Sequence, residues 1–266
     1  AGCAGAMRIV YESADSFVRW KANGYVDLAG ADSAELDDRI DAFHAWHRSA
    51  ALPRYAQLAE EAARRLGDGL SQADLVWGYD SLVAQGGESL RAAAEQIAPL
   101  LDRVGAEQLH HIERGFAEDN RRFAKDYLRG SEEDRRKRRV RRTVERLEDW
   151  VGRLSEAQLA RVQQYAERVP AVDELRDADR RRLQAGFLEI VREGKARERL
   201  PAFVAGWQKG RDPAYAAASE AFRREFHALL LDLDGSLTPG QRARAVARLR
   251  GYAADFAALA RKRAPH

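Results

Sequence analysis

Histidines and carboxylates at helical spacing are the residues of this chain best suited to catalysis or metal binding. His44 and His47 lie one turn apart, and Asp41 precedes His44 by three residues. Glu107 and His110 have the i, i+3 spacing of carboxylate–histidine pairs that ligate iron in helical bundles. A di-iron centre needs two such pairs and two further inward carboxylates, and the pattern supplies no such set. We therefore expect structural or surface histidines, no metal and no cofactor. A metal-dependent enzyme that uses Asp41, His44 and His47 is kept as an alternative.

A second motif resembles a phosphatase signature. Residues 229–238 read Leu-Leu-Leu-Asp-Leu-Asp-Gly-Ser-Leu-Thr, similar to the Asp-x-Asp-Gly-Thr sequence of haloacid-dehalogenase-type phosphatases. In those enzymes a long αβ domain follows the motif, whereas here only 28 of the 266 residues follow Thr238. The residues upstream have helical spacing, so we expect a helix that ends at Gly235. The sequence also contains no zinc-protease, nucleophile-elbow, phosphate-loop or dinucleotide motif, and the chain is predicted not to be an enzyme.

The elements that carry these residues are predicted to be helices. Ala, Leu, Arg and Glu are abundant, whereas strand-forming residues are few, with five Ile and two Thr. No run of about 18 apolar residues occurs, which excludes a transmembrane helix within this sequence. The composition therefore predicts an all-α protein, an elongated or curved multi-helix bundle with long amphipathic helices.

Apolar periodicity and turn residues predict where these helices begin and end. A helix over 71–103 is expected to be interrupted at Gly86–Gly87. We divide the chain into a short tether at 1–6, an N-terminal helical lobe at 7–129 and a C-terminal lobe at 130–266, with one continuous domain as the alternative. The other predicted helices cover 7–20, 32–52, 53–66, 109–127, 140–154, 155–169, 173–194, 196–209, 213–232 and 239–263.

Four helix starts share a pattern in which an apolar residue precedes a small residue, and Gln or Asp follows three positions later. A Ser or Thr oxygen at the small position caps the free N–H groups, and the Gln completes a capping box. We expect ordinary local helix starts. Leu-Ser/Thr-x-x-Gln also resembles the repeated motif of helical periplasmic chaperones of the Spy and CpxP kind, which cradle unfolded clients. The four segments are Leu70–Asp74, Val104–Gln108, Leu154–Gln158 and Leu237–Gln241.

Positive charge is concentrated in one block. The formal net charge is only +3, which produces a weak overall field. No aromatic residue is interleaved in the block, so nucleic acid is not expected as a partner. The block is a candidate patch for anionic lipid or an acidic partner, and a solvated helix face is the favoured alternative. It comprises Arg135, Arg136, Lys137, Arg138, Arg139, Arg141 and Arg142.

The single cysteine, Cys3, excludes an internal disulfide. Ala1-Gly2-Cys3-Ala4 resembles the end of a bacterial lipobox, in which a lipid is attached to Cys and the chain is cut just before it. The resemblance implies that Cys3 is lipidated and that Ala1 and Gly2 are removed. Ala4, in place of Asp, implies retention at the outer membrane, facing the periplasm. An ordinary free cysteine is the alternative.

A group of aromatic, acidic, histidine and arginine residues follows Cys3. They are Asp15, Trp20, Tyr25, Asp27, His44, Trp46, His47, Arg48, Arg54 and Tyr55, with Leu52 and Pro53 between the last groups. Through these residues, segment 3–55 resembles an uncharacterised family of proteobacterial lipoproteins, numbered 6279 among the domains of unknown function. The resemblance implies an anchored helical periplasmic protein and supplies no reaction or catalytic residues. We take the residues that carry it as a candidate binding cluster and favour packing of the first helices as their role.

These observations predict a membrane-anchored, non-enzymatic binding protein, chaperone-like in acting on polypeptide or envelope components. The missing catalytic motifs, the repeated helix starts and the many arginines support this prediction. A structural component of an envelope assembly is the main alternative, and a metal-dependent envelope enzyme is the other.

Overall fold

The computed structural model describes residues 31–261, and these residues form helices and short connections, with no strand among them. The prediction of an all-α multi-helix fold is confirmed. The α-helices are α2 (Ala31–Trp46), α3 (Leu52–Asp68), α4 (Gln72–Leu101), α5 (Ala106–Phe123), α6 (Glu132–Val151), α7 (Glu156–Arg168), α8 (Asp173–Arg192), α9 (Ala196–Ala205), α10 (Pro213–Asp234) and α11 (Pro239–Arg261). Two π-helical turns, η1 (His47–Ala51) and η2 (Ala124–Leu128), complete the set.

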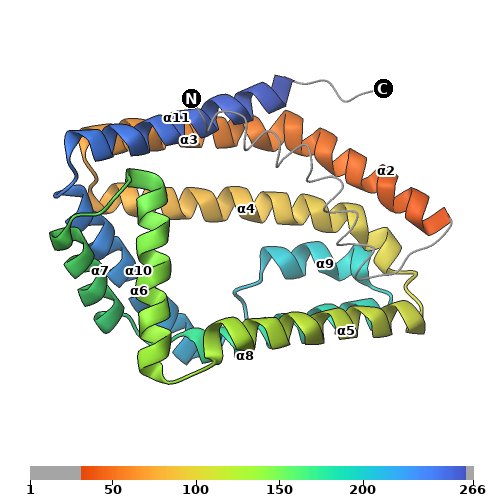
Figure 1. Ribbon diagram of the computed structural model, residues 1–266. Coiled ribbons are helices and arrows are strands. Elements are labelled where there is room, and N and C mark those ends of the chain that lie inside the picture. Colours follow the sequence, from red (N-terminus) through yellow and green to blue (C-terminus); the bar gives the residue numbers. More distant parts are fainter. Residues whose placement is uncertain (1–30, 262–266) are drawn as a thin grey trace.

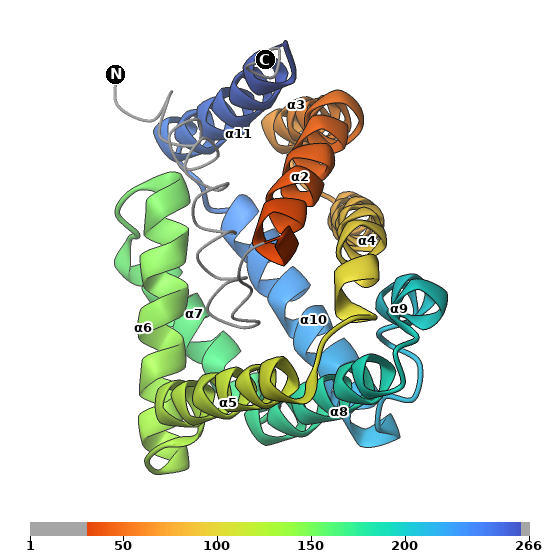
Figure 2. The ribbon, with the colours of Figure 1, turned by 90° about the vertical axis from the view of Figure 1, so that its right-hand side faces the viewer.

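The helices are arranged as a frame rather than as a parallel bundle (Figure 1). Along one side α11 returns to pack beside α3, and along the opposite side α5 lies beside α8. Helices α6, α7 and α10 connect these two sides, and α4 carries α9 alongside its C-terminal half (Figure 2). The contacts of α11 with α3 and of α4 with α9 join segments on the two sides of Gly130.

Two apolar clusters hold this frame together. The first joins the C-terminal half of α4 to α8 and α9, through residues such as Ala98, Ile190 and Leu200, all at most 2% exposed. The second joins α6, α7 and α10 around Val162 and Leu229. Buried apolar area of this kind is the main stabilising term in a helical domain, so the two clusters fix the corners of the frame.

Helices begin at all four positions predicted from the shared pattern, and two of these starts dock against each other. The Ser155 and Thr238 hydroxyls each accept from the backbone N–H of the Gln three positions later, which completes the predicted caps. The side-chain amides of Gln158 and Gln241 then donate to each other's oxygens, at 3.1 Å in both directions. Gln158 also donates to the Ser236 carbonyl at 3.0 Å. The glutamines of these two starts are therefore used to join α7 to α11.

The phosphatase-like segment ends α10, as the sequence predicts. Asp234 is buried at the helix C-terminus, and its carboxylate accepts from the guanidinium of Arg242 at 2.7 Å and from the backbone N–H of Leu70 at 3.1 Å. Arg242 donates in addition to the carbonyl of Leu66. Asp234, an aspartate of the phosphatase-like motif, thus links the α10–α11 turn to the α3–α4 connection.

Four predicted boundaries are wrong. Helix α6 begins at Glu132 instead of residue 140, because Ser131 and Asp134 form a capping box there. Helix α4 runs without a break through Gly86 and Gly87. Each glycine lowers the stability of the helix by only about 1 kcal/mol relative to alanine, and the turn that follows them contacts α3. Arg54 pairs there with Glu88, and the Tyr55 hydroxyl lies 3.3 Å from Ser89 Oγ. The helix expected over 196–209 ends at Ala205, where a turn begins, and α2 continues into α3 through η1 instead of ending near residue 52.

Candidate functional site

An apolar stripe on α4, formed by Val76, Tyr79, Leu82, Val83 and Leu90, is open to solvent. Leu82 is 59% exposed, Leu90 56% and Val76 43%. At 3.6 residues per turn, the five side chains fall within an arc of about 120° on one face of the helix. Gly86 and Gly87 lie between them, and a Cβ placed on either would have no atom of another group within 4 Å. Large apolar side chains gathered on one open helix face are typical of an interaction site.

The same face of α4 is covered about one to three turns further along. Ala94 and Leu101, which lie on the same side of the helix as the stripe, are buried against α9. From α9 the side chains of Leu200, Phe203 and Val204 make this contact, at the i, i+3, i+4 spacing of an amphipathic helix. Within residues 31–261 the stripe thus continues this helix-packing surface with its apolar side chains exposed, and the Arg223 guanidinium of α10 lies over the Tyr79 ring at 4.7 Å.

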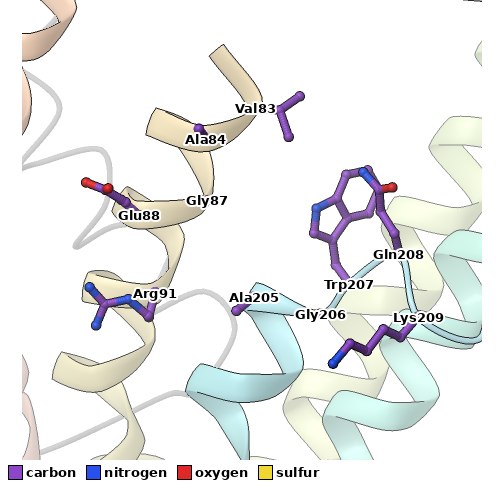
Figure 3. A pocket seen from close by; sticks show the side chains of 10 residues that line it. All are labelled: Val83, Ala84, Gly87, Glu88, Arg91, Ala205, Gly206, Trp207, Gln208 and Lys209. Carbon is purple, nitrogen blue, oxygen red and sulfur yellow. The ribbon is translucent and has the colours of Figure 1, made fainter. Parts of the chain in front are cut away.

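A cleft of about 480 Å³ lies where α9 ends and the stripe begins. Its α4 wall includes Val83, Gly87 and Arg91, and its other wall is the turn that follows α9, with Trp207 and Lys209. Figure 3 shows the Val83 side chain directed toward the indole of Trp207, while Glu88 extends the other way. The cleft therefore joins an apolar floor to a rim of mixed charge, with Lys209, Glu88 and Arg91, the last paired with Glu95 at 2.6 Å.

Two arginines hold the Trp207 wall in place. Arg182 donates to the backbone carbonyls of Trp207 at 2.9 Å and Lys209 at 3.0 Å. The Arg211 guanidinium lies over the Trp207 ring at 4.6 Å and over Tyr215 at 4.7 Å. Because the backbone and the ring are both fixed, this wall is preorganised rather than collapsed into the cleft.

The predicted binding cluster is brought together only in part. The rings of His44, Trp46 and His47 surround Phe43, with ring centroids 5.6 to 6.0 Å from its own, and His47 also contacts Tyr55 at 6.0 Å. The Arg54 side chain is directed to α4, where it pairs with Glu88. Arg48 is half-buried next to His47. Asp15, Trp20, Tyr25 and Asp27, together with the predicted 7–20 helix and Cys3, lie outside the described residues.

Burial lowers the pKa of His47 to about 4, and the charges of His44 and Arg48 act in the same direction. His47 is therefore neutral at pH 7. Burial, followed by the charge of Arg223, also lowers the pKa of His227. Between residues 31 and 261 no group of three or more His, Cys, Asp and Glu side chains lies close enough to hold a metal ion.

Replacing His47 with Phe is expected to reduce the loss of stability on acidification. In the unfolded chain its imidazole takes up a proton near the ordinary pKa of 6.5, whereas the folded chain resists protonation down to about 4. Stability that is complete above pH 6.5 is therefore lost progressively as the pH falls toward 4. Urea unfolding at pH 7 and pH 5 measures this loss. It should be smaller in H47F and unchanged in H110Q, which removes an exposed imidazole; equal losses in all three proteins would contradict the assignment.

The arginine-rich block on α6 is mostly engaged within the molecule. Arg135 pairs with Glu174 at 3.1 Å, Arg139 with Asp173 at 3.7 Å, Lys137 with Glu133 at 2.8 Å and Arg141 with Glu145 at 3.8 Å. Arg138 and Arg142 donate to backbone carbonyls of the preceding turn. Within the part of the chain that the structure describes, Arg136 makes no such contact. The block as a whole is therefore not one free cationic patch.

Comparison with known families adds one match. A model for a family of unknown function, DUF6279, matches residues 24–208, which is more than half of the chain. The chain belongs to DUF6279. Searches of the curated proteins and of the solved structures find no match. The predicted membership of this family is therefore confirmed over residues 24–208, whereas the lipoprotein character expected from residues 3–55 stays a prediction.

In this DUF6279 protein the matched region includes α2 to α9, and hence the stripe and the cleft as far as Gln208, with Lys209 just beyond its end. No helix in the described range of 31–261 combines the length and apolar character needed to cross a membrane. Sequence reasoning missed the stripe and Trp207. The 3- and 4-residue spacing from Val76 through Val83 marks an apolar face, but nothing in the sequence shows that this face lacks a covering helix.

Proposed function

We propose that this chain is a non-enzymatic binding protein that takes up an amphipathic helical segment of a polypeptide along the α4 stripe. The observation that carries the proposal is the continuity of the stripe with the α4–α9 interface. Helix α9 shows what this surface accepts, because Leu200, Phe203 and Val204 pack on it at helical spacing. A bound helix would extend the row that α9 begins, as in other helix-in-groove interactions.

The dimensions of the stripe suit such a segment. From Val76 to Leu90 it spans about 21 Å at 1.5 Å per residue, which is close to four helical turns. The cleft beside Trp207 would receive one large apolar side chain at the end nearest α9. Lys209 at its rim would favour an acidic residue next to that side chain.

The proposal is tested with a fluorescent amphipathic peptide of about 14 residues that has Leu at i, i+3, i+4 and i+7 and Ala, Glu and Gln elsewhere. Anisotropy should rise on titration with the unlipidated chain. A scrambled peptide of the same composition should bind at least about tenfold more weakly, because its apolar residues no longer share one face. Equal binding of the two peptides, or binding of neither, would overturn the proposal.

We also propose that lipid on Cys3 anchors the chain at the periplasmic face of the outer membrane. The lipobox-like Ala1-Gly2-Cys3-Ala4 supports this proposal. Intact mass of natively produced protein should show a mass increase at Cys3, and the protein should be recovered with outer membranes. The Cys3→Ser variant should be recovered in the soluble fraction. An unmodified thiol in native protein would contradict the anchor and would leave the peptide-binding proposal untouched.

A further inference from the structure

A single buried carboxylate contacts both arginines that hold the Trp207 wall of the cleft. Asp179 on α8 is 7% exposed. Its Oδ1 accepts from Nε of Arg182 at 2.9 Å, and its Oδ2 pairs with Nε of Arg211 at 3.4 Å. Each oxygen of the carboxylate is therefore used by a different arginine.

The two arginines act on different parts of the wall. Arg182 donates to the backbone carbonyls of Trp207 at 2.9 Å and of Lys209 at 3.0 Å. The Arg211 guanidinium lies over the Trp207 ring at 4.6 Å. The backbone and the indole of Trp207 are thus connected to α8 by separate contacts, and both contacts lead to Asp179.

Burial makes these contacts depend strongly on the carboxylate. The Asp179 side chain is 6% exposed and that of Arg211 is 12% exposed, so water solvates neither charge well. Removing one member of a buried ion pair leaves the charge of the other without compensation. Without the carboxylate, the guanidiniums of Arg182 and Arg211 would repel each other. Trp207 would then lose the support of its backbone and of its ring together.

We propose that Asp179 is a positioning residue that makes the cleft selective for a large apolar side chain of the bound helix. This inference rests on the proposed function. Asp179 is not among the residues that line the cleft, so it acts through Arg182 and Arg211. A fixed indole offers an entering side chain a ready contact surface, whereas a mobile indole must first be ordered, which lowers the affinity.

The test uses the full unlipidated chain and three peptides. They are the amphipathic peptide and two versions in which Ala replaces the Leu at one end or the other of its apolar row. The version that binds more weakly identifies the side chain that enters the cleft. It should bind the wild type about tenfold more weakly than the parent peptide does, because less apolar surface is buried. In D179N this ratio should fall to about threefold or less, because the wall is no longer preorganised.

Asp177 provides a matched control on the same helix. It is 9% exposed and accepts from Nε of Arg181 at 2.8 Å, so it is also a buried aspartate with an arginine partner. D177N should lower the stability of the chain, as D179N should. It should leave the ratio between the peptides unchanged, because Arg181 is not one of the arginines that hold the Trp207 wall.

Fluorine NMR of protein labelled with fluorotryptophan reports on the wall without any peptide. W207F identifies the Trp207 signal, which should move or broaden in D179N and in R211Q and stay in place in D177N. Thermal unfolding verifies that each variant folds, and R211Q tests the same step if D179N does not fold.

Three results would overturn the inference and leave the peptide-binding proposal standing. They are an unchanged ratio between the peptides in D179N, an equal fall of the ratio in D177N, and an unmoved Trp207 signal in D179N. Failure of every peptide to bind the wild type would instead overturn the proposed function, and this inference with it.

Discussion

Replacing Gln158 with Ala is expected to lower the free energy of unfolding by about 3 kcal/mol. The Gln158 side chain is 1% exposed. Its oxygen accepts from the backbone N–H of Ser155 and from Gln241, and its nitrogen donates to Gln241 and to the Ser236 carbonyl. Truncation leaves a cavity at a buried position and removes the hydrogen bonds of the half-buried Ser236 and Gln241 groups. Urea unfolding monitored by circular dichroism measures the change.

Gln108 provides the matched control for that experiment. It occupies the same position of a helix-start pattern, but its oxygen accepts only the local bond from the Gly105 backbone N–H. Q108A should therefore cost about 1 kcal/mol, the usual effect of losing a cap. Combining Q158A with Q241A should cost less than the sum of the two single changes, because the pair is broken by either one. Equal costs for Q158A and Q108A would show that the docking of the two starts is unimportant.

Placing Glu at positions 82 and 90 together is expected to weaken binding of the amphipathic peptide at least about tenfold. Full burial of a Leu side chain is worth about 1.5–3 kcal/mol, and more than half of that burial is still available at both positions. Tenfold in affinity corresponds to about 1.4 kcal/mol. The two carboxylates would in addition have to be desolvated by the bound helix. Fluorescence anisotropy with the same peptide measures the loss.

The L82E/L90E variant should fold normally, because substitutions at exposed sites usually change stability by no more than about 0.5 kcal/mol. A217E, which adds a carboxylate at an exposed position of α10, is the control for the added charge and should bind the peptide as the wild type does. Undiminished binding by L82E/L90E would show that the peptide binds somewhere other than the stripe.

The helices could be predicted because their signals are local. Ser155 with Gln158, and Thr238 with Gln241, specify helix starts within five residues, and α7 and α11 begin there. The break expected at Gly86–Gly87 was wrong because long-range contacts from α3 outweigh the local cost of glycine. The pairing of Gln158 with Gln241 depends on the path of the chain between them, which no local pattern reveals.

The candidate site was less predictable for the same reason. The proximity of His44, Trp46 and His47 can be predicted from their spacing, because they lie at the end of α2 and the start of η1. Exposure of the α4 stripe depends instead on where α9 ends.

Photo-crosslinking tests the central claim most directly. The amphipathic peptide, with a photoreactive group at its central apolar position, is irradiated with the unlipidated chain, and the attachment sites are read by mass spectrometry. We predict crosslinks within residues 76–90 and at Trp207, and their loss in L82E/L90E. Crosslinks confined to other helices, or unchanged in that variant, would contradict the assignment of the α4 stripe as the binding surface.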